Sequence, residues 1–171
     1  MLLLLVLALL APFVLAAMLI LSGWRPAVAP HYGELLAPAV PLSLDALQIL
    51  QGPEKSVLAG RWLLVATEGE ACTAACERRL DGLRRVHVAL YKAMPRVRRV
   101  LLASRAPAVD QPDLTVAALA SWPALAAPRP VIHLVDPLGR IVLRYDPAPA
   151  DFSPRRMLKD VERLLRYSWS G

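Results

Sequence analysis

Cysteine and histidine are scarce in this chain: its 171 residues include two cysteines and three histidines. There is no glycine-rich phosphate loop, no serine–histidine–aspartate arrangement that we can propose, and no internal repeat. A phosphate-binding P-loop, a triad hydrolase and a metal site with many histidine or cysteine ligands therefore have no candidate residues. What remains is one pair of thiols, Cys72 and Cys76, which are four residues apart.

Charged side chains are absent from residues 1–24, which read MLLLLVLALLAPFVLAAMLILSGW. Roughly 20 apolar residues span a bilayer core, whereas the apolar region of a secretory signal is about 7–15 residues long. We therefore predict an uncleaved, single-pass transmembrane signal anchor at residues 1–24. Pro12 inside it is tolerable, since local helix adjustments re-satisfy the freed backbone groups. A cleaved signal peptide is the alternative.

Neither flank of this segment has a surplus of positive charge, so the positive-inside rule does not orient it. Long domains translocate largely regardless of their charge. A cysteine pair that cycles through, or persists as, a disulfide suits an oxidising compartment. We expect the inner membrane, with residues 25–171 in the periplasm.

Positive charge exceeds negative charge, with 20 Lys and Arg against 14 Asp and Glu. Many of the cations fall between Arg78 and Arg99, and such clusters can bind nucleic acid or anionic lipid. Here the cations are spread along a predicted helix and strand, without regular aromatic interleaving and without a nucleic-acid-binding motif. We expect a solvated helix face, close to lipid headgroups, and no nucleic-acid partner.

Proline and alanine dominate residues 25–59, which we interpret as an extended tether with one or two helical turns near Ser43–Leu50. The compact domain is expected at residues 60–171. Its patterns predict strands at 61–67, 98–103, 130–135 and 140–145, and helices at 73–94 and 154–167, with a short helix near 114–121. The order β-α-β-(α)-β-β-α predicts an α/β fold with a central mixed sheet flanked by helices.

This pattern resembles the thioredoxin-like superfamily, and within it the membrane-anchored, Sco-type cytochrome c oxidase assembly proteins. The shared features are the N-terminal apolar segment, a Cys-x-x-x-Cys at the start of the first helix, a last helix, and a strand–Asp-Pro-x-Gly–strand hairpin at Asp136–Gly139. The resemblance implies a thioredoxin-like fold and a role in oxidase biogenesis. The implied partner is the copper subunit of cytochrome c oxidase, or a copper chaperone.

Two features depart from the Sco pattern. Thr73 and Glu77 stand where that family has proline after each cysteine, and Pro128 stands near the place of its copper-binding histidine. His133 lies inside the third strand and points either toward the thiols or into the core. Pro130, just before that strand, matches the cis-proline that faces the dithiol in thioredoxins.

The cysteine pair admits three roles. At a helix N-terminus the dipole and free N–H groups favour a thiolate, so Cys72 can attack a partner's disulfide and Cys76 can resolve the product, as in a thiol-disulfide oxidoreductase. Two thiolates, with or without His133, can also hold Cu(I), since soft sulfur ligands select it. In the third role the pair is an inert disulfide that only braces an assembly scaffold. His31 and His87 are expected to be surface or packing residues, and Asp136 a turn-former.

Overall fold

The computed structural model describes residues 1–23, 31–68, 72–108, 111–119, 130–147 and 152–168. The chain divides into two units, residues 1–30 and residues 31–171. In the first unit, the α1 helix (Leu2–Leu21) contains Pro12, and Ser22 is its C-cap residue. Within the described part of the chain, no helix combines the length and the apolar character needed to cross a membrane.

The second unit is built on a seven-stranded mixed sheet with strand order β1-β7-β6-β3-β4-β5-β2. The central strand β3 pairs in parallel with β4 and antiparallel with β6, and β4 pairs in parallel with β5. At one side of the sheet, β6 pairs antiparallel with β7, and β7 pairs antiparallel with the edge strand β1. At the other side, β5 pairs antiparallel with the edge strand β2. The strands are β1 (Glu34–Pro41), β2 (Leu47–Gln51), β3 (Trp62–Thr67), β4 (Val97–Leu102), β5 (Leu114–Leu119), β6 (Ile132–Val135) and β7 (Arg140–Tyr145).

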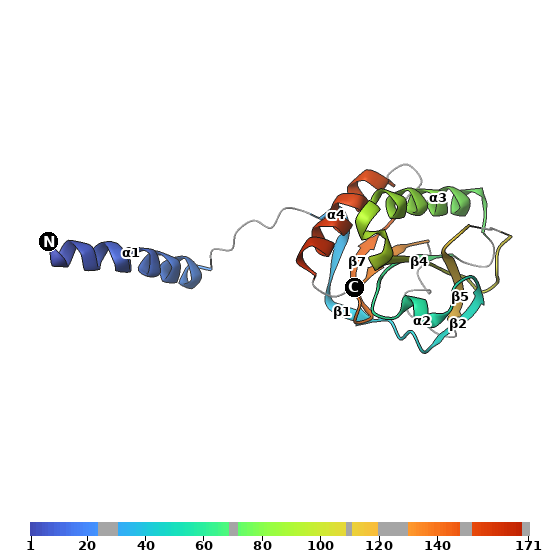
Figure 1. The fold of residues 1–171 in the computed structure, drawn as a ribbon, viewed down its shortest axis with the longest axis horizontal. Helices are drawn as coiled ribbons and strands as arrows, with labels where there is room; N and C mark the ends of the chain where they lie inside the picture. Colours follow the sequence, from blue (N-terminus) through green and yellow to red (C-terminus); the bar gives the residue numbers. More distant parts are fainter. Residues whose placement is uncertain (24–30, 69–71, 109–110, 120–129, 148–151, 169–171) are drawn as a thin grey trace. The chain divides into compact units, whose positions relative to one another are not determined.

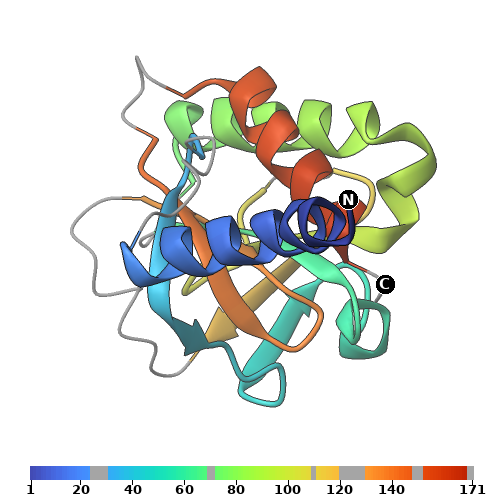
Figure 2. The same ribbon diagram turned by 90° about the vertical axis from the view of Figure 1, so that its left-hand side faces the viewer.

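Each face of the sheet has its own apolar layer. The helices α3 (Ala74–Ala89) and α4 (Pro154–Tyr167) lie together on one face (Figure 1; Figure 2). Their apolar sides pack on Leu64 and Ala66 of β3. The short helix α2 (Lys55–Leu58) contributes Leu58 to the other layer, which contains Leu63 and Val65. Every residue of β3 is buried, which explains why its first five residues, Trp62–Ala66, are all apolar rather than alternating.

The predicted mixed sheet flanked by helices is confirmed, and the strands expected at 61–67, 98–103, 130–135 and 140–145 match β3, β4, β6 and β7. The short helix expected near 114–121 is wrong for its described residues, since Leu114–Leu119 is the strand β5. Its position between β4 and β2 gives hydrogen-bonding partners on both sides, and these outweigh the local helical tendency of an alanine-rich segment.

The expected tether over 25–59 also needs correction. Residues 24–30 lie outside the described residues, but β1, β2 and α2 fall within this range and belong to the second unit. The helical turns expected near Ser43–Leu50 are replaced by β2, which pairs with β5. Pro41, at the end of β1, is compatible with an edge strand, where a missing N–H group leaves no ladder bond unmade.

The helix expected over 73–94 is shorter than predicted. α3 ends at Ala89, and a 3₁₀ helix (Tyr91–Arg96) that contains Pro95 continues to β4. His87 stabilises this transition from α-helix to 3₁₀ helix, because its Nε2 lies 3.1 Å from the carbonyl oxygen of Met94 and 2.9 Å from that of Val97. His87 is thus a buried packing residue, and burial lowers its pKa.

A buried carboxylate on α4 fixes the first residues of the second unit. Asp160 Oδ2 accepts hydrogen bonds from the backbone N–H groups of Tyr32 at 2.9 Å and Gly33 at 3.0 Å. The Tyr145 hydroxyl donates to the same oxygen at 3.4 Å, and His31 Nδ1 lies 3.8 Å from Oδ1. Burial, and then the Asp160 charge, raise the pKa of Tyr145, so its hydroxyl stays a donor. We call these five residues the N-terminal clasp.

Two glycines with positive φ allow the backbone geometry to be tested. A Cβ on Gly52 (φ +88°) would lie 2.2 Å from the carbonyl oxygen of Leu114, whereas one on Gly60 (φ +69°) would meet nothing within 4 Å. We expect Gly60→Ala to lower the free energy of unfolding by about 1 kcal/mol from the left-handed backbone alone. Gly52→Ala should cost about 2–3 kcal/mol, because β5 must also shift. Equal losses in urea unfolding would contradict this.

Candidate functional site

The two cysteines lie between the end of β3 and the first turn of α3. Thr67 ends β3, Cys72 precedes the helix by two residues, and Cys76 is the third residue of the helix. Thr73 occupies the N-cap position, and its carbonyl oxygen accepts the N–H of Glu77 at 3.0 Å. The sulfurs therefore lie at the positive end of the helix dipole, where a thiolate is stabilised.

The sulfurs of Cys72 and Cys76 form a disulfide, with their Cα atoms 5.2 Å apart. Cys76 is 1 % exposed and belongs to the apolar layer beneath α3. Cys72 is half-buried and packs against the edge of that layer. A partner molecule consequently reaches Cys72 before Cys76. This asymmetry is what an attacking thiol followed by a resolving thiol requires.

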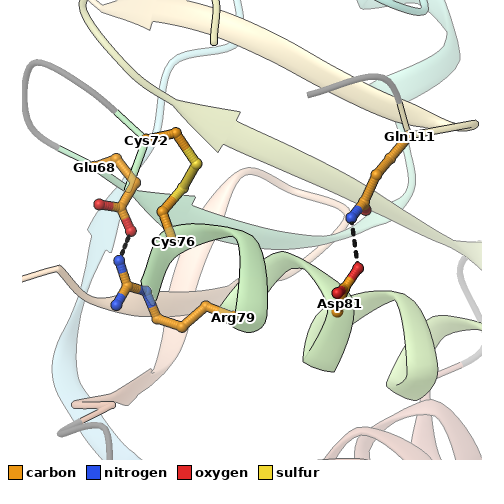
Figure 3. The surroundings of a disulfide bond; sticks show 6 residues. All are labelled: Glu68, Cys72, Cys76, Arg79, Asp81 and Gln111. Atoms are coloured by element: carbon orange, nitrogen blue, oxygen red, sulfur yellow. Dashed lines mark hydrogen bonds and ion pairs between the residues drawn. A yellow bond between two sulfur atoms is a disulfide. The ribbon is translucent and has the colours of Figure 1, made fainter. Parts of the chain in front are cut away.

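An ion pair lies beside the disulfide (Figure 3). Arg79 Nη2 donates to Glu68 Oε1, and the two side chains are 11 % and 6 % exposed. The N–H of Glu68 also donates to the carbonyl oxygen of Leu102 at 2.9 Å, so the end of β3 is fixed to β4. Burial lowers the pKa of the Arg79 guanidinium. The pair joins the residue that precedes the cysteine loop to the helix that follows it.

This pair is the part of the site that sequence reasoning missed. Glu68 and Arg79 are visible in the sequence only as opposite charges on either side of the cysteines. Residues 68–79 do not form one continuous helix or strand, so no single periodicity predicts this contact, which follows from the turn between β3 and α3. Further along α3, Asp81 accepts a hydrogen bond from Gln111 at 2.9 Å (Figure 3).

Pro130, just before β6, lies at the same end of the central strands as the cysteines, which follow β3. Thr67 N–H donates to the carbonyl oxygen of Val131 at 2.9 Å, and Val131 N–H donates to Thr67 Oγ1 at 3.0 Å. The antiparallel register of β3 with β6, which pairs Ala66 with Ile132, therefore brings half-buried Pro130 beside Glu68. Arg129 lies outside the described residues, and a cis peptide bond before Pro130 stays a prediction.

His133 lies on the opposite face of the sheet from the disulfide. It pairs with Val65, and Val65 belongs to the apolar layer of the α2 face, whereas Cys76 belongs to the layer beneath α3. Burial, and then the charge of Arg144, lower the pKa of His133 to about 4. Because the sheet separates the imidazole from the sulfurs, His133 cannot serve as a third ligand to a metal held by both cysteines.

No group of three or more histidine, cysteine or acidic side chains suited to a metal occurs among the residues that the structure describes. Pro128, which the resemblance places near the copper-binding histidine of Sco proteins, lies outside them. His31 belongs to the N-terminal clasp, and His87 contacts backbone carbonyl oxygens beyond the end of α3. Asp136 forms the hairpin turn, accepting the N–H groups of Leu138 and Arg140 at 2.9 Å. A site of two thiolates and one imidazole therefore does not fit this domain.

The difference in burial predicts a difference in reactivity. In the reduced protein, we expect Cys72 to react with iodoacetamide at least about tenfold faster than Cys76, because Cys72 is half-buried whereas Cys76 is buried. Peptide mapping of the alkylated chain by mass spectrometry measures both rates in one sample. Equal or reversed rates would contradict the arrangement.

Comparisons with solved structures find the same fold in Sco proteins. Apo Sco1 from Thermus thermophilus superposes with a TM-score of 0.55 at 22 % identity, covering 81 % of this chain and 99 % of that chain. Yeast Sco1 with copper bound gives a TM-score of 0.53 at 13 % identity, covering 81 % and 91 %. BsSco, described as a member of the Sco family of cytochrome c oxidase assembly proteins, gives 0.51 at 11 % identity, covering 79 % and 100 %. At these identities the likeness concerns the fold.

A search of curated protein sequences finds no match. The model of one protein family matches residues 62–168, from the start of β3 to the residue after α4, and so takes in the cysteines, the sheet core and both long helices. That match covers more than half of the chain. The chain belongs to the family of transmembrane-like, thioredoxin-like C-terminal domains.

Proposed function

We propose that this chain is a membrane-anchored periplasmic protein that carries out thiol–disulfide exchange in cytochrome c oxidase biogenesis. The observation that carries the proposal is the Cys72–Cys76 disulfide at the start of α3, with one sulfur half-buried and the other buried in a thioredoxin-like domain. The charge-free composition of residues 1–24 supports the anchor. The oxidase role rests on resemblance to the Sco family.

The exchange begins from the dithiol form. The Cys72 thiolate attacks one sulfur of a partner's disulfide, a new S–S bond forms, and the partner's other sulfur leaves as a thiolate. Cys76 then loses its proton and attacks Cys72 Sγ, which releases the partner's second sulfur. The partner gains two electrons, and this chain ends as the disulfide. A dithiol reductant returns it to the starting form. By resemblance, the partner is the cysteine pair of the oxidase copper subunit or a copper chaperone.

A trapping experiment tests the exchange. The reduced full-length protein, in detergent, is mixed with an oxidised peptide that carries the cysteine pair of an oxidase copper subunit. We expect Cys76→Ser to accumulate a mixed disulfide at Cys72, visible by mass under non-reducing conditions, because the resolving thiol is missing. Cys72→Ser should accumulate none and should fail to reduce the peptide. Slow reduction by the native protein, equal to that by the double cysteine variant, would refute the proposal.

The second candidate function is Cu(I) carriage, which the closeness of the two soft sulfurs favours. An anaerobic competition titration of the reduced protein against a chromophoric Cu(I) chelator distinguishes the two functions. Tight one-to-one binding that is lost in both Cys72→Ser and Cys76→Ser would favour the carrier. Weak or cysteine-independent binding would remove copper from the function.

A scaffold whose disulfide only braces the fold makes a separate prediction. If the double variant Cys72→Ser/Cys76→Ser stays folded and still supports oxidase assembly, neither exchange nor Cu(I) transfer is required. Oxidase activity of membranes from a strain that carries only the double variant is the measurement. We expect that activity to be lost while the variant remains present in the membrane at its normal level.

A further inference from the structure

The exposed side of α4 is strongly basic. Arg155, Arg156, Lys159 and Arg166 are exposed on it, and Glu162 is the one acidic residue exposed among the described residues of this helix. The helix's other carboxylate, Asp160, is buried in the N-terminal clasp. Arg85 of α3 adds a further cation beside the start of α4. We call these five cations the basic face.

A surface hollow of about 490 Å³ lies within the basic face, between α3 and the start of α4. Arg85 and Arg155 line it together with the apolar side chains of Val86, Phe152 and Leu158. Cations beside an apolar floor suit an amphiphile with an anionic headgroup, whose phosphate contacts the guanidinium groups while carbon atoms contact the floor. A phospholipid has this chemistry.

The length of the connecting chain limits how far the second unit can lie from the apolar N-terminal segment. Only eight peptide units join Gly23, just after α1, to His31. They span at most about 28 Å when fully extended. His31, Tyr32 and Gly33 are fixed to Asp160, which is a residue of α4 itself. If residues 1–24 lie in a bilayer, the chain length therefore lets the basic face reach the headgroups of that bilayer.

We propose that the basic face docks on the anionic phospholipid headgroups of the membrane that holds residues 1–24. The inference rests on the proposed anchor. Local attraction between cations and an anionic leaflet acts only within about one Debye length of the surface, roughly 8 Å at physiological salt. The short connection keeps His31 within about 28 Å of Gly23, just after α1, so the face can enter that range while residues 1–24 stay in the membrane. A separate acidic protein would first have to reach the face by diffusion.

Docking through α4 leaves the disulfide accessible. The end of α4 is tied to the beginning of β3, since Trp62 Nε1 donates to Ser168 Oγ at 3.2 Å and Arg96 donates to the Leu165 carbonyl oxygen at 3.2 Å. The cysteines follow the other end of β3. The membrane contact would thus fix the orientation of the domain while Cys72 stays open to a partner.

Photo-cross-linking of the full-length protein tests the docking. Benzoylphenylalanine replaces exposed Glu162 in the basic face or, as the control, exposed Gln48 on β2. Each protein is reconstituted in phosphatidylcholine vesicles with or without about 30 % phosphatidylglycerol. After irradiation, we expect about fivefold more lipid adduct at position 162 than at position 48, measured by intact mass, and only when phosphatidylglycerol is present.

Charge variants supply the second arm. Lys159→Gln/Arg166→Gln should reduce the adduct at position 162 to the level at position 48, whereas Lys55→Gln/Arg105→Gln, with the same charge change outside the basic face, should leave it unchanged. Equal adduct at both positions, or no effect of phosphatidylglycerol, would overturn the proposal. A cross-link from position 162 to a protein instead of lipid, in the native membrane, would overturn it in favour of an acidic protein partner.

A separate measurement in the same vesicles tests whether residues 1–24 anchor the protein in the membrane. Extraction with alkaline carbonate should leave the protein in the membrane pellet in pure phosphatidylcholine, where the basic face has no anionic partner. Release by carbonate would refute the anchor of the proposed function. Retention with equal adducts at positions 162 and 48 would refute only the docking.

Discussion

Asp160→Ala should lower the free energy of unfolding by about 3–5 kcal/mol, the largest effect that we expect from one substitution in this chain. The carboxylate accepts two backbone N–H groups, of which the Gly33 bond is buried, and the Tyr145 hydroxyl. Without it, these donors lose their partner, and the buried Gly33 N–H and Tyr145 hydroxyl have little access to water as a replacement. Asp160→Asn, which keeps one acceptor oxygen, should lose roughly half as much.

Urea unfolding of the full-length protein in detergent, followed by tryptophan fluorescence, measures the loss. Glu162→Ala, on the exposed side of the same helix, is the matched control and should change the free energy by less than about 0.5 kcal/mol. Equal losses in the two variants would show that the effect is not specific to the N-terminal clasp, since both substitutions raise the helix propensity of α4.

The second large effect is a loss of stability on acidification that depends on His133. Its pKa is lowered from 6.5 to about 4 in the folded protein, because burial disfavours the imidazolium. Below pH 6.5 the unfolded chain binds a proton that the folded chain does not, so stability falls as the pH decreases. The loss from this residue should reach about 3 kcal/mol at pH 4 and then stop growing, since both states are protonated below that value.

His133→Leu isolates this contribution. Other groups also change the pH dependence, and the lowered pKa of His87 acts in the same direction. The quantity to compare is therefore the difference in unfolding free energy between pH 7 and pH 4, which should be about 3 kcal/mol smaller in the variant. An unchanged difference would show that the imidazole titrates normally. Proton NMR of the His133 ring would give its pKa directly.

The elements that sequence analysis predicts well are those with a local signal. Residues 62–66 are apolar throughout, and residues 154–167 have a helical period with Met157, Val161 and Leu165 buried. The Asp136–Gly139 turn has its expected hydrogen bond, since Gly139 N–H donates to the Asp136 carbonyl oxygen at 2.9 Å. In each case, the signal that predicts the element lies within the element's own sequence.

The elements that it mispredicts depend on partners far away in the chain. β1 becomes a strand by pairing with β7, about one hundred residues later, and β2 by pairing with β5. The proline- and alanine-rich sequence of β1 indicates only extended chain, and the sequence of β2 is also compatible with the helical turns expected near Ser43–Leu50. His133 shows a similar limit, because the strand period says that it faces away from Ile132 and Leu134 but not which face carries the cysteines. That depends on where α3 packs.

The N-terminal clasp also has a mechanical consequence. Any force that passes along the chain from residues 1–24 enters the domain at His31, ahead of Glu34, the first residue of β1. Acting on β1 alone, such a force would break the ladder with β7 one bond at a time, starting from the pair of Glu34 with Arg144. Because Tyr32 and Gly33 are bound to Asp160, the load passes first into α4, which packs on the sheet along its length, and the edge strand is shielded from peeling.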